Sequence, residues 1–314
     1  MTNSITVNRM FTALAQMLAL TWVSGHAGGD KQLRSDMVQK PSLALIGHLN
    51  FVHPNRVQVL GCAEMDYLGK LNFDDLRLAI ENLFSTELAA VIVANGESVP
   101  EPLRAASQRT NTPLFATPLP SPELMAVLSH YLVNALAESI SVHGVMLEVN
   151  GIGVMLTGES SAGKSELALE LLTRGHRFVA DDVVDLYKTA PDTLSAQSPA
   201  MLQDYLEVRG LGVLDIRALF GELAIKMKKN LKLIVHLKPL EEAVSDNISR
   251  LDMLASTETI LGIDVPKVQI PVAIGRNLAV LVEVAARNHI LRMRGVNSAE
   301  VFIARQKKML EAGE

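Results

Sequence analysis

The sequence predicts an α/β fold in two domains, a small N-terminal α/β domain over residues 1–130 and a C-terminal domain over residues 131–314. A chain of 314 residues exceeds the usual size of one hydrophobic core, so two cores are expected. Short apolar runs alternate with helical patterns in both parts, and prolines punctuate residues 118–122 between them. A helical pattern over Glu123–Ile140 follows these prolines, and we place the boundary near residue 130.

Apolar runs define the elements of the N-terminal domain. Phe11, Leu14, Met17 and Leu18 share one face of a helical pattern over Met10–Val23, which favours an amphipathic helix over a secretion signal. Strands are expected at Leu43–Gly47, Arg56–Gly61, Ala89–Ala94 and Pro113–Thr117, and a helix at Leu76–Leu83.

The C-terminal domain opens with a β-hairpin pattern. Val145–Val149 and Ile152–Thr157 are joined by Asn150-Gly151, the favoured two-residue turn. A helix is expected over Ser165–Arg174, with an apolar stripe on one side and a glycine directly after it as its C-cap. A strand, a glycine-containing loop and a helix therefore follow one another in the order that a phosphate-binding loop requires.

The loop itself has the spacing that cradles nucleotide phosphates. Glycines at both ends allow backbone N–H groups to turn inward, at the positive end of the following helix. Lys164 is expected to reach the β- and γ-phosphates, and the Ser165 hydroxyl to bind Mg²⁺. The eight loop residues are Gly158, Glu159, Ser160, Ser161, Ala162, Gly163, Lys164 and Ser165.

An acidic pair follows the next strand. Asp181 and Asp182 come after Phe178–Ala180, where a carboxylate can accept the proton of an attacking hydroxyl. Asp182 is our candidate base. The alternative is a strand-end pair that faces water or binds Mg²⁺ only through water. No guanine-reading Asn-Lys-x-Asp segment accompanies the loop, so transfer is favoured over switching.

Charged residues interrupt the apolar segment Leu206–Asp215, which we expect to form a strand with flanking glycines, Gly210 and Gly212. Glu207 is a candidate metal ligand and Arg209 a candidate phosphate contact, although a surface ion pair between them is the competing interpretation.

Three further positions carry chemistry. Gly275 and Arg276 precede a helical pattern over Leu278–Leu291, so this loop is suited to hold an anion. Arg250 and His143 are also candidates, although residues of these types, taken alone, are more often ordinary solvated side chains.

Composition narrows the class of protein. A net charge of -5 supplies no field for nucleic acid, and no stretch has the ~20 continuous apolar residues of a membrane span. One cysteine permits no internal disulfide and fits a reducing, cytoplasmic location.

These segments together resemble the HPr kinase/phosphorylase family, bacterial enzymes that phosphorylate a serine of the phosphocarrier HPr and remove that phosphate by phosphorolysis. The resemblance spans nearly the whole chain. It is carried by Pro54–Gly61, Val142–Val145, the phosphate loop and Ala180–Asp182, and most specifically by Glu207–Gly212.

The resemblance implies a role for each candidate. Asp182 becomes base for phosphorylation and acid for the reverse reaction, Glu207 a second metal ligand, His143 an assistant and Arg250 the catalytic arginine. The segment ending at Asp215 serves both reactions. The resemblance also implies Mg²⁺, ATP or pyrophosphate as donor, HPr as substrate, a homohexamer, and a nucleotide core like that of phosphoenolpyruvate carboxykinase.

One loop departs from the family. The family's dephosphorylation loop commonly reads Pro-Val-Arg-Pro-Gly-Arg, whereas Ala273 and Ile274 stand in its middle here. Pro271, Gly275 and Arg276 persist, so phosphorylase activity is expected to survive. A small-molecule kinase and a non-catalytic ATP-sensing scaffold are the competing functions; chain length disfavours the first, and Asp182 with Glu207 disfavours the second.

Overall fold

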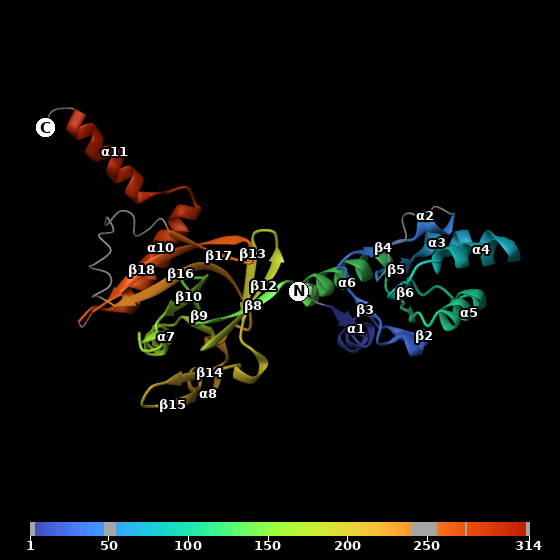
Figure 1. Ribbon diagram of the computed structural model, residues 1–314, viewed down its shortest axis with the longest axis horizontal. Coiled ribbons are helices and arrows are strands. Elements are labelled where there is room, and N and C mark those ends of the chain that lie inside the picture. The colour runs from blue at the N-terminus through green and yellow to red at the C-terminus, as the bar shows by residue number, and fades with distance from the viewer. Residues whose placement is uncertain (1–3, 47–54, 240–255, 274, 312–314) are drawn as a thin grey trace. The chain divides into compact units, whose positions relative to one another are not determined.

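The computed structural model describes residues 4–46, 55–239, 256–273 and 275–311, and these form two compact units, Met1–Glu138 and Ser139–Glu314 (Figure 1). The expected boundary near residue 130 falls inside helix α6, which continues to Leu136 and belongs to the first unit. Arg250 and Ile274 lie outside the described residues. None of the helices in the described part of the chain is long and apolar enough to cross a membrane.

The first unit contains a five-stranded sheet in the order β2-β7-β6-β5-β4, in which only β2 is antiparallel to its neighbour. β6 is buried along its whole length, and separate apolar clusters cover the two faces of the sheet. The elements are β1 (Ile5–Thr6), α1 (Val7–Leu14), β2 (Thr21–Ser24), β3 (Gln32–Leu33), β4 (Val38–Gln39), α2 (Ser42–Leu45), β5 (Val57–Leu60), α3 (Cys62–Lys70), α4 (Phe73–Leu83), β6 (Ala90–Val93), α5 (Glu101–Arg109), β7 (Leu114–Ala116) and α6 (Ser121–Leu136).

Two predictions for this unit were wrong. The helix expected over Met10–Val23 ends at Leu14, because the chain reverses through a positive φ at Ala19 and then enters β2, where Trp22 pairs with Phe115. The run Leu43–Gly47, expected as a strand, contributes the short helix α2 that packs on α4. Short apolar runs are compatible with either structure, and tertiary packing decides between them.

The second unit is built on a nine-stranded sheet, counted over the described residues, whose main path runs β11-β9-β10-β16-β13-β12-β8, while β18 pairs with β16 and β17. The elements are β8 (Ser139–His143), β9 (Val145–Val149), β10 (Ile152–Gly158), α7 (Lys164–Thr173), β11 (Arg177–Ala180), β12 (Val183–Ala190), β13 (Thr193–Gln197), β14 (Tyr205–Val208), β15 (Gly212–Asp215), α8 (Ile216–Phe220), β16 (Lys229–Pro239), β17 (Ser256–Ile260), β18 (Ile263–Val272), α10 (Leu278–Met293) and α11 (Ser298–Glu311).

Strand direction determines where the site forms. β10, β16 and β18 are parallel neighbours, and β11 runs in the same direction because β9, between β11 and β10, is antiparallel to both. The segments that follow these four strands therefore leave the same edge of the sheet. Ligands of open α/β sheets bind at the carboxyl ends of such strands.

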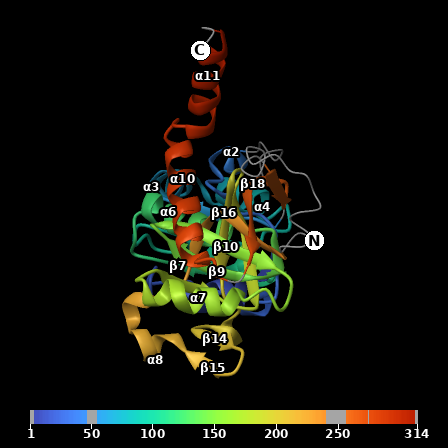
Figure 2. The same cartoon turned by 90° about the vertical axis from the view of Figure 1, so that its left-hand side faces the viewer.

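Helices α7 and α10 cover one face of this sheet (Figure 2). Leu167, Leu171 and Val282 are buried there against apolar residues of β9, β10 and β16. Helix α11 extends away from the sheet in both views (Figures 1 and 2).

The expected hairpin and glycine cap are confirmed. Asn150 and Gly151 both have positive φ values, of 50° and 84°, which the two-residue turn between β9 and β10 requires. At the end of α7, Gly175 has a φ of 89° and donates its N–H to the Leu172 carbonyl, while the His176 N–H reaches Leu171. The phosphate-loop helix is thus fixed at both ends by backbone geometry.

Candidate functional site

The phosphate loop connects β10 to α7 and requires glycine where it leaves the strand. Gly158 has a φ of +140°, and a Cβ there would lie 2.5 Å from the carbonyl oxygen of Leu237 on the neighbouring strand β16. Gly163 has a φ of +79° at the N-cap of α7. A side chain at Gly158 would clash with the Leu237 backbone, and one at Gly163 would be strained by the positive φ, so glycine at both positions lets the backbone N–H groups of the loop face an anion.

Lys164, the first residue of α7, lies across the loop. Its Nζ donates to the carbonyl oxygens of Gly158 at 3.0 Å and Glu159 at 2.8 Å. The ammonium is therefore held at the mouth of the loop by neutral acceptors, which a phosphate oxygen can displace with a stronger charge-assisted bond. The geometry suits a lysine that binds phosphate.

Asp181 joins three elements of the site. Its side chain is only 5% exposed; Oδ1 accepts from the Ser165 hydroxyl at 3.2 Å, and Oδ2 accepts from the Glu207 backbone N–H at 2.9 Å. Burial raises the pKa of the Asp181 carboxyl, while these hydrogen bonds oppose the rise. The loop helix, β11 and β14 are thereby tied to one carboxylate.

The Asp182 side chain faces solvent beside His143. Its φ is +62°, a conformation that aspartate tolerates better than most residues, and its side chain is 71% exposed. His143 Nδ1 lies 3.2 Å from the Asp182 carbonyl oxygen and 3.6 Å from Oδ1. Because Val183 pairs with His143 across β12 and β8, the two site residues are brought together by strand register.

The segment over 206–215 is a hairpin, so the single strand expected from sequence was wrong. β14 and β15 pair antiparallel, and the chain reverses through Gly210 and Gly212, whose φ values of 86° and 83° suit a tight turn. Glu207 and Arg209 are both exposed, and no ion pair joins them among the described contacts.

Asp215, at the end of this hairpin, has a local structural role. Its Oδ1 caps α8 by accepting the Ala218 N–H at 2.9 Å. The cap fixes where the hairpin ends and the following helix begins.

The third loop of the site leaves β18. Pro271 lies in that strand, Gly275 has a φ of 83°, and the Arg276 N–H donates to the Ala273 carbonyl at 3.2 Å. Asn277 then caps α10 by accepting the Val280 N–H. Only β16 separates β18 from β10, so the two strands lie about 10 Å apart, and this loop leaves the same edge of the sheet as the phosphate loop.

The donor set fits a magnesium-bound nucleotide. Mg²⁺ prefers oxygen ligands and keeps phosphate oxygens and water in its shell, so one hydroxyl and one or two carboxylates suffice. Ser165 provides the hydroxyl, which donates to the Asp181 carboxylate. The backbone N–H of Glu207 donates to the same carboxylate. Fold and site together define a P-loop phosphotransferase.

Comparison with known proteins identifies the family. The family model described as "HPr Serine kinase N terminus" matches residues 5–132, and the one described as "HPr Serine kinase C-terminal domain" matches residues 134–306. The HPr kinase/phosphorylase of Chromobacterium violaceum is 51% identical over 99% of this chain and 98% of the relative. That of Neisseria meningitidis is 46% identical over 99% and 97%.

Among solved structures, the Hpr(Ser) kinase/phosphatase from Coxiella burnetii is 37% identical, covering 49% of this chain and 99% of that chain with a TM-score of 0.45. The chain belongs to the HPr serine kinase family.

The sequence identified Asp181 as one of an acidic pair at the site and favoured Asp182 as the base. The observation that distinguishes it is its burial between Ser165 and Glu207, residues 16 and 26 positions away. A partial signal exists in the sequence, because a carboxylate directly after a wholly apolar strand starts at the buried end of that strand.

Proposed function

We propose that this chain transfers the γ-phosphoryl group of ATP to a serine hydroxyl of HPr, and that it also removes this phosphate by phosphorolysis. The observation that carries the proposal is the connection from Ser165 through Asp181 to the Glu207 backbone, which fixes the phosphate loop against the hairpin. Phosphoryl transfer depends on such positioning and on charge stabilisation more than on covalent chemistry by the protein.

In the forward direction, Lys164 holds the β- and γ-phosphates and Asp182 accepts the serine proton. A new bond forms between the serine oxygen and the γ-phosphorus as the bond to the β–γ bridging oxygen breaks, leaving ADP. Mg²⁺, held by Ser165 and Glu207, would neutralise charge on the phosphates. His143, 3.6 Å from Asp182 Oδ1, orients that carboxylate.

The reverse direction uses the same groups. An oxygen of inorganic phosphate attacks the seryl phosphate, the serine oxygen leaves with a proton from Asp182, and pyrophosphate forms. Gly275 and Arg276 hold the incoming phosphate, and Arg209 with Gly210 and Gly212 faces the transferred group. Pyrophosphate is accordingly a possible donor in the forward direction. The proposal assigns Arg250 to the transferred group on the family resemblance alone.

We place this activity in the cytoplasm and in an assembly of several copies, a hexamer by family resemblance. Sedimentation velocity tests the assembly: a single monomeric species at micromolar concentration would exclude it.

Incubation with Mg-ATP and HPr tests the forward reaction. Mass spectrometry should find one phosphoserine on HPr, and Lys164→Ala should abolish it because the γ-phosphate loses its cation. A matched control is Lys188→Ala, which removes a β12 lysine whose Nζ donates to the Leu261 carbonyl in the turn between β17 and β18. If Lys164→Ala still phosphorylates HPr at the wild-type rate, the loop is not the site of transfer.

A further inference from the structure

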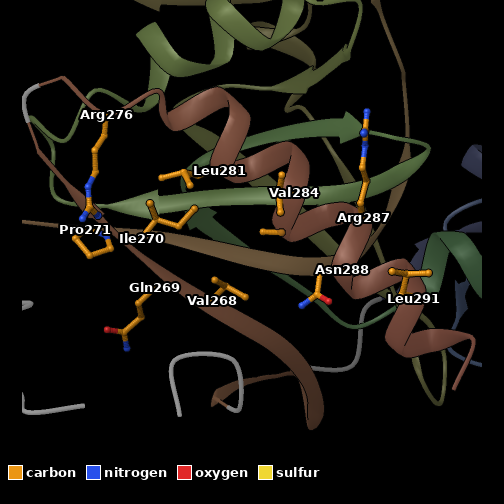
Figure 3. Close-up of a pocket in the computed structure, with 11 residues that line it drawn as sticks. Val268, Gln269, Ile270, Pro271, Arg276, Leu281, Val284, Arg287, Asn288 and Leu291 are labelled. Atoms are coloured by element: carbon orange, nitrogen blue, oxygen red, sulfur yellow. The ribbon is translucent and has the colours of Figure 1, made fainter. Parts of the chain in front are cut away.

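A pocket lies between β18 and α10, next to the loop that carries Gly275 and Arg276 (Figure 3). Its volume is about 540 Å³, within the roughly 300–1,000 Å³ of small-molecule sites. Most of the lining residues are apolar and a few are polar, which is the usual composition of small-molecule sites. The lining residues central to its chemistry are Val268, Ile270, Leu281, Val284, Arg276 and Asn288.

Helix α10 has two apolar faces, and only one is used by the core. Ala279, Val282 and Ala286 are buried against the sheet. Leu281 and Val284, which line the pocket, remain 37% and 55% exposed. An apolar group placed against them would be stabilised by removing this surface from water. The pocket therefore favours a ligand with an apolar body.

The polar groups specify the charge of the ligand. Figure 3 shows the Arg276 side chain directed toward Pro271 and Ile270, and Asn288 directed toward Val268, whereas Arg287 extends away from them. No aspartate or glutamate lines the pocket, and among the described residues no carboxylate pairs with Arg276. A guanidinium that no described carboxylate pairs with, at one end of an apolar pocket, is complementary to an anion.

We propose that this pocket binds a small aliphatic carboxylate, whose chain lies between α10 and β18 and whose carboxylate pairs with Arg276. The regulatory consequence depends on the proposed function. Arg276 also belongs to the loop assigned to inorganic phosphate, so a bound carboxylate withholds it from that phosphate. Phosphorolysis is inhibited, while phosphorylation of HPr, which uses the phosphate loop, continues.

Displacement of a fluorescent anion tests the binding directly. The probe is 8-anilinonaphthalene-1-sulfonate, used with saturating Mg-ATP so that the phosphate loop is occupied, and displaced by octanoate below its micelle concentration. Val284→Glu places a carboxylate in the pocket wall and should weaken both anions about tenfold or more. Met293→Glu is the matched control, because this residue is on the same helix, is 52% exposed and lies outside the pocket.

The proposal is wrong if Val284→Glu binds both anions as the wild type does, or if the wild type binds them only when Mg-ATP is absent. It is also wrong if the wild type binds neither anion, and dissociation of an oligomer by Val284→Glu would then show that a second copy covers the pocket. In the activity assay, octanoate should slow pyrophosphate release from phosphoseryl-HPr and leave its phosphorylation unchanged. If octanoate binds but the protein shows no phosphorolysis even without octanoate, the proposed function is wrong and the proposed binding site still holds.

Discussion

Replacing Asp182 by asparagine should lower the rate of phosphoryl transfer without destabilising the fold. The Asp182 side chain is 71% exposed, and asparagine tolerates its φ of +62°, so the free energy of unfolding should change by no more than about 0.5 kcal/mol. Loss of a general base lowers kcat by roughly 10²–10⁴-fold. Mg-ATP affinity should persist, because Lys164, Ser165 and Asp181 are unchanged.

The adjacent variant Asp181→Asn is a control, because it should lower the Mg-ATP affinity that Asp182→Asn leaves unchanged. Asparagine can keep both hydrogen bonds, because its oxygen accepts the Glu207 N–H while its NH₂ donates to the Ser165 hydroxyl, but the negative charge is lost. Hydrogen bonds to a charged group contribute about 1.5–3 kcal/mol and neutral ones about 0.5–1.5 kcal/mol, so Mg-ATP affinity should fall roughly tenfold.

Stability distinguishes the two variants further. Burial raises the pKa of Asp181 in the folded protein, so its ionised form is disfavoured by folding at neutral pH. The contribution of this group to stability is therefore complete below the unfolded pKa, about 3.9, and is lost as pH rises through the folded value. The wild type should gain stability relative to Asp181→Asn as pH falls through that range.

Isothermal titration calorimetry with Mg-ATP, steady-state phosphorylation of HPr and thermal unfolding measure these three quantities. Asp182→Asn with wild-type kcat refutes the assignment of the base. Asp181→Asn with wild-type Mg-ATP affinity refutes the contribution of the Asp181 charge to nucleotide binding.

The remaining predictions concern three other parts of the catalytic unit. Gly158→Ala should abolish Mg-ATP binding in calorimetry, because its Cβ would lie 2.5 Å from the Leu237 carbonyl; retained binding would show that the loop adapts. Arg276→Ala should lower pyrophosphate release from phosphoseryl-HPr at least tenfold more than it lowers HPr phosphorylation, and equal losses would place Arg276 in both reactions. Glu283 bonds Arg174, which lowers its pKa from 4.5 to about 2, so Glu283→Gln should lower the Tm at pH 7. That deficit should shrink as pH falls from about 4.5 to about 2, where the folded carboxylate is protonated, and a constant deficit would point to packing instead.

The parts of the site that local sequence determines could be predicted. The Asn150-Gly151 turn, the glycines of the phosphate loop and Gly175 each need a positive φ, and glycine or asparagine at these places specifies it. The helix after the loop was predictable because its buried residues recur at helical spacing.

The parts that depend on distant contacts could not. Whether residues 42–45 form a helix depends on α4, and whether residues 21–24 form a strand depends on pairing with β7. The burial of Asp181 becomes visible only when Ser165 and Glu207 are brought to it in space. The pocket was also hidden, because periodicity marks the apolar residues of α10 without showing which of its two faces the core covers.

In the proposed mechanism, one P-loop site both adds phosphate to an HPr serine and removes it. A two-stage reaction tests it most directly: Mg-ATP and HPr are incubated with the full chain, ATP is removed, and inorganic phosphate is added. Mass spectrometry should show phosphoserine after the first stage and its loss after the second, with stoichiometric pyrophosphate, and Asp182→Asn should fail at both. Phosphoserine that never forms, or that is released as inorganic phosphate alone without pyrophosphate, would contradict the account.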